Sequence, residues 1–376
     1  MLTAIAFIAV FAVIVFSHEL GHFFTARKSG MRVWEFGFGF PPKLFGWYRD
    51  PQTKKIKFVG RKYDKKNCPV TLYSLNLLPV GGFVSIKGED GEEVMDEDSF
   101  NAQKPWKKAV VIVSGVVMNF ILAGVLLSIG LMVGMPATAD GENDKYVIDR
   151  KLEVTQILKD KPADVADIRT GDVILQVGDL VNPEVTSMQE YTNKIGSNPL
   201  DVVVLRGTEL IVKTVTPVKY ENTGKYGIGV AIVDAGIVKY PWYLAGVEGF
   251  KLAGFYTKEI FIAFGGLIKG LFVGAVPEGI SGPIGIAVMT GEVARLGLIR
   301  LLQFTAILSL NLAVLNILPI PALDGGRLLF LFLTKLNRKL KIDKYENMAH
   351  GIGFILLMIL VIIVTVRDLG ILGGLF

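Results

Sequence analysis

The chain has 376 residues, of which 51% are hydrophobic, and it carries a formal net charge of +5. Its mean hydropathy of +0.47 is too high for an ordinary soluble enzyme and indicates an integral membrane protein. A single cysteine excludes an intramolecular disulfide. The basic runs adjoin apolar stretches, which argues against nucleic acid as a partner.

Four apolar stretches are long enough to cross a bilayer, which takes about 17–25 helical residues. They cover residues 2–26, 109–135, 298–318 and 352–366, the last extendable to 348. A further segment, 242–273, is aromatic but interrupted by charges, and we expect it to form an amphipathic helix on the membrane surface. The sequence thus predicts a polytopic α-helical membrane protein with about four transmembrane helices.

The first apolar stretch contains the pentapeptide His18-Glu19-Leu20-Gly21-His22. Residues 2–26 hold no other strongly ionisable side chain, and a charge at the centre of a membrane helix costs about 2.5–3.5 kcal/mol. Such a cost is typical of a functional site, whereas a chance match would be expected on a soluble helix. On a helix the two histidines project from one face and can hold one zinc ion. Glu19 beside them suits a general base for a metal-bound water.

Catalytic zinc needs a third protein ligand, and the best candidate is Asp324. It ends the segment Asn316-Ile-Leu-Pro319-Ile-Pro321-Ala-Leu-Asp324, whose prolines cannot continue a regular helix. Unwound backbone at membrane depth must be buried in protein or face a cavity, so Asp324 can approach a metal. Asn316, with Pro319 and Pro321, is a candidate for holding an extended substrate. The alternative is that Asp324 only caps the next helix.

HELGH together with N-x-x-P-x-P-x-L-D-G-G resembles the site-2 protease family, peptidase family M50, and in particular its bacterial RseP-type members. Other motifs in the same order extend the resemblance over nearly the whole chain. They are Phe36-Gly-Phe-Gly-Phe-Pro-Pro, Leu78-Pro-Val-Gly-Gly-Phe-Val, Ser114-Gly-Val-Val-Met-Asn119 and Ser281-Gly-Pro-Ile-Gly-Ile-Ala. Val116 stands where that group usually has proline, which removes the usual cause of a kink in the second helix.

The resemblance implies an intramembrane zinc metalloprotease that binds one Zn²⁺ through His18, His22 and Asp324, with Glu19 as general base. It implies a membrane-associated β-rich loop, which agrees with the alternating β-formers at 33–40 and 56–59. It also makes Asn119 a candidate for substrate binding. Substrates would be transmembrane proteins, such as anti-sigma factors or signal-peptide remnants, pre-shortened by another protease. Membrane lipid is the other expected partner.

The polar middle of the chain predicts an inserted α+β domain. We expect strands at 151–158, 172–177, 200–205 and 209–217, and a short helix near 187–195. The string from Lys161 to Asp179, KPADVADIRTGDVILQVGD, resembles the signature of PDZ domains attached to proteases. One copy is recognisable, over about 145–220. Such a domain would either capture peptides by strand addition or exclude large substrates by size.

The basic residues predict the orientation in the membrane. Residues 27–66 contain twelve Lys or Arg against three acids, and residues 335–344 contain five against one, so both loops should be cytoplasmic. The predicted domains are a first membrane part at 1–136, an extracytoplasmic PDZ domain at 137–234 and a second membrane part at 235–376. The expected location is the bacterial inner membrane, crossed several times.

Other functions fit parts of these observations. A membrane-embedded zinc endopeptidase could act on surface or lipid-anchored peptides, although HELGH lies deep in the first stretch. A metal transporter would not need Glu19 between the two histidines, and a PDZ membrane scaffold would not need the metal-binding residues.

Overall fold

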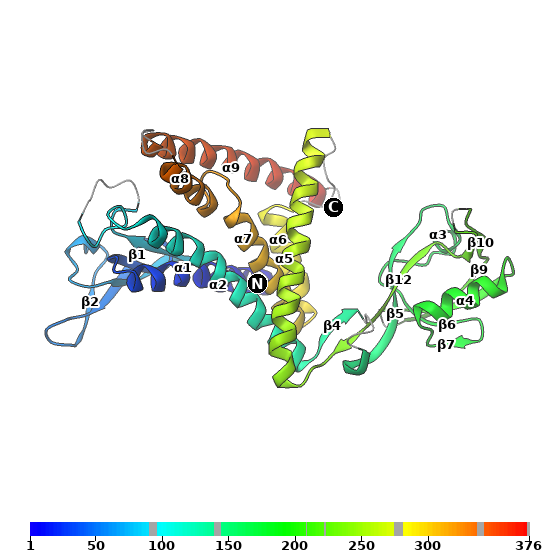
Figure 1. Ribbon diagram of the computed structural model, residues 1–376. Helices are drawn as coiled ribbons and strands as arrows, with labels where there is room; N and C mark the ends of the chain where they lie inside the picture. Colours follow the sequence, from blue (N-terminus) through cyan, green and yellow to red (C-terminus); the bar gives the residue numbers. More distant parts are fainter. Residues whose placement is uncertain are drawn as a thin grey trace. The chain divides into compact units, whose positions relative to one another are not determined.

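The computed structural model describes residues 1–89, 96–138, 144–207, 209–221, 223–273, 281–336 and 342–373. The chain divides into two compact units, one joining Met1–Gly130 to Gly246–Phe376 and the other comprising Leu131–Ala245. Figure 1 shows their helices and strands along the chain. Residues 337–341, within the basic segment 335–344 whose side of the membrane was predicted, lie outside the described residues.

Among the described residues, four helices are long and apolar enough to cross a membrane, which confirms the predicted fold class. They are α1 (Leu2–Lys28), α2 (Pro105–Val133), α7 (Leu298–Ile317) and a part of α9 (Ile342–Gly373). The apolar part of α9 runs over Tyr345–Gly370, longer than predicted, because the helix continues through polar residues at both ends of the apolar run. Helix α2 passes Val116 without interruption, as the missing proline predicts.

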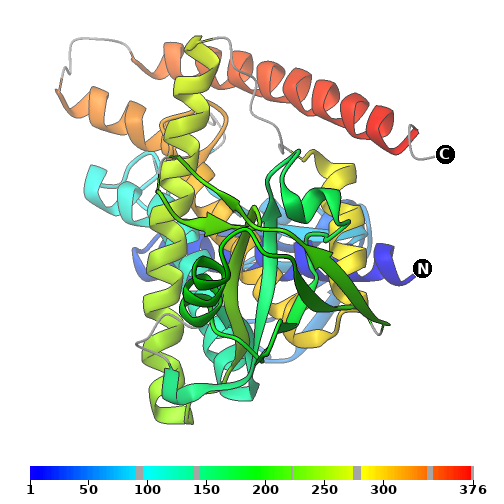
Figure 2. The same ribbon diagram turned by 90° about the vertical axis from the view of Figure 1, so that its right-hand side faces the viewer.

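Three further helices belong to the membrane unit, wholly or in large part: α5 (Trp242–Val273), α6 (Pro283–Arg295) and α8 (Asp324–Leu336). The predicted amphipathic segment is a helix, α5, and it is not among the spans found in the described residues. Within this unit α5 runs across the direction of α1 and α9 in both views (Figures 1 and 2). Its packing on α2 depends on small residues, because a Cβ at Gly249 would meet the backbone of Ser128.

The Ser281-Gly-Pro-Ile motif leads into α6, and a carboxylate from α9 holds the first turn of that helix. Asp368, 6% exposed, accepts hydrogen bonds from the backbone N–H groups of Gly285 at 2.8 Å and Gly282 at 3.3 Å. A Cβ at Gly282 would lie 2.8 Å from the same carboxylate. The motif glycines therefore leave room for a cap that satisfies otherwise unpaired donors at a helix start.

The predicted β-rich loop is confirmed as a three-stranded antiparallel sheet of order β2-β1-β3. Its strands are β1 (Val33–Arg49), β2 (Ile56–Val59) and β3 (Leu72–Ile86). Phe16 of α1 stacks on Phe38 with ring centroids 5.3 Å apart, and Phe23 packs on Phe36 at 4.9 Å. These aromatic contacts hold the sheet against the half of α1 that contains HELGH.

The inserted unit has a sheet of order β4-β12-β5-β6-β8-β9, with β7 paired to β6. The strands are β4 (Met135–Thr138), β5 (Val147–Ile157), β6 (Val173–Val177), β7 (Leu180–Val181), β8 (Leu200–Arg206), β9 (Glu209–Val215) and β12 (Val230–Val238), beside a small ribbon of β10 (Val218–Lys219) and β11 (Tyr226–Gly227). Helices α3 (Pro162–Val165) and α4 (Val185–Ile195) complete it. All four predicted strands and the predicted helix are present, whereas β4 and β12 were not predicted.

Candidate metal centre

Three predicted ligands from two distant parts of the chain meet inside the membrane unit. Nε2 of His18 lies 3.0 Å from Oδ2 of Asp324, Nε2 of His22 lies 3.4 Å from the same oxygen, and the two nitrogens are 3.1 Å apart. All three ligand atoms lie within 4.8 Å of one another. Both histidines are 7% exposed. One carboxylate oxygen and two imidazole nitrogens at such spacing can share one metal ion.

Helix α2 shapes the histidine side of this centre. The Nδ1 atom of His22 is 2.8 Å from the carbonyl oxygen of Val111, which leaves Nε2 to face Asp324. A Cβ at Gly115 would lie 2.5 Å from Cε1 of His18 and 2.5 Å from Nε2 of His22. Only glycine at this position lets α2 approach both rings. Gly21 has the same role on α1, because its Cβ would meet the backbone of Ser114.

The break between α7 and α8 presents Asp324. Helix α7 ends at Ile317 and α8 begins at Asp324, as the two prolines predict. Ala322 has a φ of +79°, which is unfavourable for a residue with a Cβ. Its N–H donates a 2.8 Å hydrogen bond to Nδ1 of His350 on α9. A Cβ at Gly353 would lie 2.6 Å from Cβ of Pro321, so α9 packs directly on this turn.

Glu19 lies beside the three ligands but faces the sheet. Its Oε2 accepts a 3.0 Å hydrogen bond from the backbone N–H of Val84 in β3. In antiparallel pairing, an N–H of β3 that is not directed at β1 points to the free edge of the strand. The carboxylate is therefore at the edge of the sheet and next to His18 in sequence, where it can move a proton at the metal centre.

The other predicted site residues occupy different surroundings. Nδ2 of Asn316 lies 3.4 Å from Nε2 of His18, so this amide borders the centre. Pro319 lines a pocket, and Pro321 touches α9. Asn119 is fully buried, and its side chain has no hydrogen-bond partner among the described residues. Its assignment to substrate binding stays a prediction.

Two contacts near the centre were missed from the sequence. Arg327, one helical turn after Asp324, donates a 2.6 Å bond to Glu89, which follows β3. His350 holds the Asp324 turn from α9. The spacing of Arg327 from Asp324 was a readable signal, but the partner of each residue is far away in sequence.

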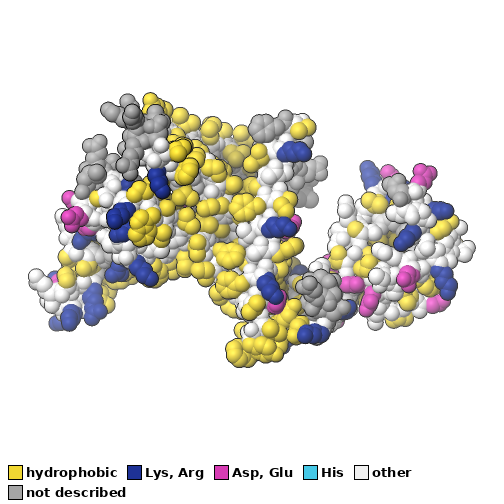
Figure 3. Space-filling model, viewed as in Figure 1, with side chains coloured by type: hydrophobic (Ala, Val, Ile, Leu, Met, Phe, Trp, Pro, Cys, Tyr) yellow, Lys and Arg dark blue, Asp and Glu magenta, His cyan; other side chains and the backbone are white. Residues whose placement is uncertain are grey.

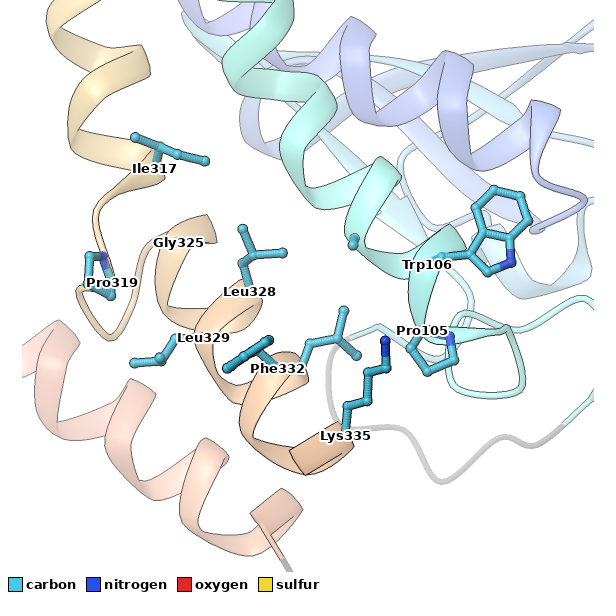
Figure 4. A pocket seen from close by; sticks show the side chains of 11 residues that line it. Pro105, Trp106, Ile317, Pro319, Gly325, Leu328, Leu329, Phe332 and Lys335 are labelled. Carbon is cyan, nitrogen blue, oxygen red and sulfur yellow. The ribbon is translucent and has the colours of Figure 1, made fainter. Parts of the chain in front are cut away.

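An apolar pocket of about 500 Å³ is lined by Gly325, the residue after Asp324 (Figure 4). It lies between the first turns of α2 and the α7–α8 region, with Lys335 as its charged lining residue. Other residues of its wall are Pro105, Trp106, Ile317, Pro319, Gly325, Leu328 and Phe332. This volume and lining are typical of a site for an apolar group of a ligand.

The outer surface of the helices is apolar, as the lining of the pocket is. Figure 3 shows hydrophobic side chains over much of this face of the membrane unit, with Lys and Arg around the sheet and along α5. No histidine is visible on this face, in agreement with the burial of His18 and His22. The two histidines are thus buried in a unit whose visible face is largely apolar, as expected for ionisable groups at membrane depth.

Comparison with known proteins defines the class as a zinc metallopeptidase. A protein of Clostridium perfringens described by name as a zinc metalloprotease is 32% identical over 96% of this chain and 98% of its own length. The zinc metalloprotease RasP of Oceanobacillus iheyensis is 28% identical over 98% and 99%, and the regulator of sigma-W protease RasP of Bacillus subtilis is 29% identical over 98% of both chains.

The chain belongs to peptidase family M50, whose profile matches residues 6–60 and 53–360. It is a multi-pass membrane metallopeptidase with Zn²⁺ as its cofactor. The donor set fits this ion, because catalytic zinc takes imidazole nitrogens and a carboxylate oxygen and keeps one position open. The buried Oδ2 of Asp324 has no hydrogen-bond donor other than the histidines among the described residues.

Solved PDZ domains resemble a smaller part of the chain. The PDZ domain of an SdrC-like protein from Listeria monocytogenes matches 22% of this chain and 85% of its own at 16% identity, with a TM-score of 0.21. A related PDZ domain from Listeria innocua covers 22% of this chain and 92% of its own, with the same identity and TM-score.

Proposed function

We propose that the chain is an intramembrane protease that hydrolyses peptide bonds in transmembrane segments of membrane proteins. His18, His22 and Asp324 hold the zinc ion, and Glu19 is the general base. The observation that carries this proposal is the meeting of three ligand atoms within 4.8 Å of one another beside the Glu19 carboxylate, two of them on α1, which is long and apolar enough to span a membrane. A soluble substrate would not require a site at that depth.

The proposed chemistry divides between the ion and the chain. When bound, zinc supplies a Lewis acid that polarises a carbonyl and acidifies water. Glu19 takes the proton of the attacking water and passes it to the leaving amide nitrogen. The Val84 N–H orients the Glu19 carboxylate, and the Val111 carbonyl orients His22. Asn316, which borders His18, is placed to bind the backbone of an extended substrate.

The sheet and the pocket suit an unwound apolar segment. A helical peptide hides its amides, so the substrate must extend before cleavage. The Gly82–Ile86 part of β3 pairs with β1 on one side, and its other edge faces Glu19, so a substrate can add to it as a strand. The apolar pocket beside Asp324 then receives side chains next to the scissile bond. Apolar side chains are what a transmembrane segment supplies.

Glu19→Gln in the full chain tests the function. Zinc content should stay unchanged, because Glu19 is not a ligand, whereas cleavage of a detergent-solubilised protein with one transmembrane segment should be lost. Glu292→Gln, at an exposed position of α6, is the matched control and should retain both. Retained cleavage in Glu19→Gln would show that Glu19 is not the general base. Faster cleavage of a soluble juxtamembrane peptide than of the membrane segment would favour the surface endopeptidase instead.

We also propose that the chain lies in the bacterial inner membrane with the β1–β3 sheet in the cytoplasm and the 137–234 region outside. The support is the excess of Lys and Arg in residues 27–66. Single cysteines are introduced at the exposed positions Thr53 and Thr186. In intact cells, a membrane-impermeant thiol reagent should label the cysteine at 186 and not the one at 53. Cys68, 1% exposed, is first changed to alanine. Labelling at 53 but not at 186 would show that the chain has the opposite orientation in the membrane.

The inserted unit is proposed to select substrates by size, so that a substrate shortened by another protease is preferred. If the unit stands outside and the metal centre is near the cytoplasmic face, it cannot take part in bond cleavage. Removal of residues 145–220 should then leave cleavage of a shortened substrate intact and permit some cleavage of the full-length form. A folded, zinc-loaded deletion protein that cleaves neither form would show that the unit has a direct part in capture.

A further inference from the structure

Three polar side-chain atoms beside the metal centre are buried without a hydrogen-bond partner among the described residues. They are Nδ1 of His18 and both Nδ2 and Oδ1 of Asn119. Asn119 is 0% exposed and lies on α2, one of the candidate spans. Each unsatisfied buried polar group costs about 1–3 kcal/mol. Such a group in a native structure calls for an explanation by a partner or a function.

Several contacts place Asn119 next to the ring of His18. The ring packs against Gly115, and Asn119 is four residues further along α2, on the same face. Ser17, the neighbour of His18, donates a 3.2 Å bond to the carbonyl of Met118, the neighbour of Asn119. Helix α1 therefore touches α2 at 115 and again at 118, with His18 at the level between these two points.

Helix α7 closes the same space from a third direction. Ser309 donates a 2.9 Å hydrogen bond to the backbone carbonyl of Asn119. Asn316, two turns further along α7, reaches Nε2 of His18. The amide of Asn119 is thus enclosed by the three helices that surround His18, and it does not open to the surface.

The two histidines differ in what holds their outer nitrogen. Nδ1 of His22 is fixed by the Val111 carbonyl at 2.8 Å, whereas Nδ1 of His18 has no such acceptor. A histidine that binds metal through Nε2 nearly always donates its Nδ1–H to an oxygen, which sets the tautomer and the ring orientation. In this region of α2, Asn119 is the side chain with an unused acceptor oxygen.

We propose that Asn119 is a positioning residue for the metal centre. Its Oδ1 accepts the Nδ1–H of His18 through one ordered water, and so keeps the Nε2 lone pair directed at the ion. The proposal rests on the proposed function, since it takes His18 as a zinc ligand. It gives Asn119 a role other than substrate binding, and it explains why an amide is kept at a position where a leucine would pack in an apolar helix.

Asn119→Leu in the full detergent-solubilised chain tests the proposal. Zinc affinity, measured by competition with a chromophoric chelator, should fall about 10–100-fold, the effect typical of losing the partner of a metal-bound histidine. Asn119→Asp keeps an acceptor oxygen and should restore most of the affinity. The control Asn311→Leu removes another amide from a span, one that bonds only its own helix at Ile307, and should leave zinc affinity unchanged.

A second measurement separates positioning from packing. The chain has three histidines, so ¹⁵N-histidine spectra of the zinc-loaded protein can be assigned with single variants. The Nδ1 signal of His18 should report a protonated, hydrogen-bonded nitrogen, and in Asn119→Leu it should shift while that of His22 stays. Unchanged zinc affinity and an unchanged His18 signal in folded Asn119→Leu overturn the inference. Zinc retained by His18→Ala would instead overturn the proposed function.

Discussion

The two units of the chain differ in the polar side chains that they bury. The inserted unit encloses an apolar cluster that includes Val154, Val177 and Val202, each fully buried, and its buried Asp172 is paired with Arg206. In the membrane unit the side chain that α9 buries between Tyr345 and Gly370 is the carboxylate of Asp368, and His18, Asn119 and Ser309 are buried as well. The first arrangement is stabilised by removing apolar surface from water. The membrane unit gains no such free energy in lipid, so its buried polar side chains have to be explained by their hydrogen bonds and their function.

Glycines show the same contrast. In the inserted unit, Gly171 and Gly207 serve turns, since they have positive φ angles and no neighbour that a Cβ would meet. In the membrane unit glycines let helices and side chains approach closely, as at Gly21, Gly115 and Gly353. Without a hydrophobic driving force, close backbone packing is the main source of helix association in membranes. Substitutions that add one methyl group should therefore act very differently in the two units.

The largest effect is expected for Gly115→Ala. The added Cβ would lie 2.5 Å from atoms of both histidines, so the rings must move out of the metal-binding arrangement. Overpacking of this kind costs about 1–3 kcal/mol, and here the cost falls on the zinc site. Zinc content and proteolysis should both be lost. Gly254→Ala on α5, where a Cβ meets nothing within 4 Å, is the control and should bind zinc normally. Normal zinc binding by Gly115→Ala would contradict the packing described.

Asp172→Asn should destabilise the inserted unit and leave the metal centre intact. Asp172 accepts two 2.8 Å bonds from the Arg206 guanidinium and one from the backbone N–H of Arg169. Losing bonds between charged groups costs about 1.5–3 kcal/mol. Limited proteolysis of the unit should accelerate, while zinc content stays constant. Asp201→Asn, at an exposed position, is the comparison. Loss of zinc in Asp172→Asn would show that the two units depend on each other.

Gly353→Ala should lower zinc affinity less than Gly115→Ala does, because it disturbs only the turn that presents Asp324. Its Cβ would lie 2.6 Å from Pro321, so the turn that presents Asp324 must shift by some tenths of an ångström. We expect zinc affinity to fall by about tenfold, equivalent to about 1.4 kcal/mol. Gly351→Ala, in the same helix with nothing within 4 Å of the added Cβ, should match the wild type. Equal affinities in the two variants would show that α9 does not support Asp324.

The smallest expected effect is on the pH dependence of the inserted unit. Burial alone would raise the pKa of Asp172, but the bonds from Arg206 outweigh it and hold this pKa below its usual value. A carboxyl with a lowered folded-state pKa stabilises the fold above its unfolded pKa of about 4, and this contribution is lost as the pH falls through the folded value. The melting temperature of the unit should therefore drop below about pH 4. Asp172→Asn should flatten that drop, and an equal drop in the variant would exclude Asp172 as its cause.

Local sequence was enough to predict the elements of both units. Apolar length specified the four spans, alternation specified β1, β2 and the strands of the inserted unit, and Pro319 and Pro321 specified the end of α7. The four-residue spacing of His18 and His22 is also a local property, since one helical turn brings the two rings together. These features depend on residues within one or two turns of each other, which is why periodicity and breaker residues reveal them.

The tertiary structure decided which distant groups complete the site. The approach of Asp324 to His18 joins residues about 300 positions apart, and the supports at Val84, Val111 and His350 come from three separate elements. Two of those supports are backbone groups, which every residue possesses and no sequence pattern marks. The pairing of β4 with β12 was missed for a similar reason, since it joins strands almost a hundred residues apart. The sequence by itself therefore determined the residue types of the candidate zinc ligands and their helices, whereas packing between helices determined how each of those residues is held.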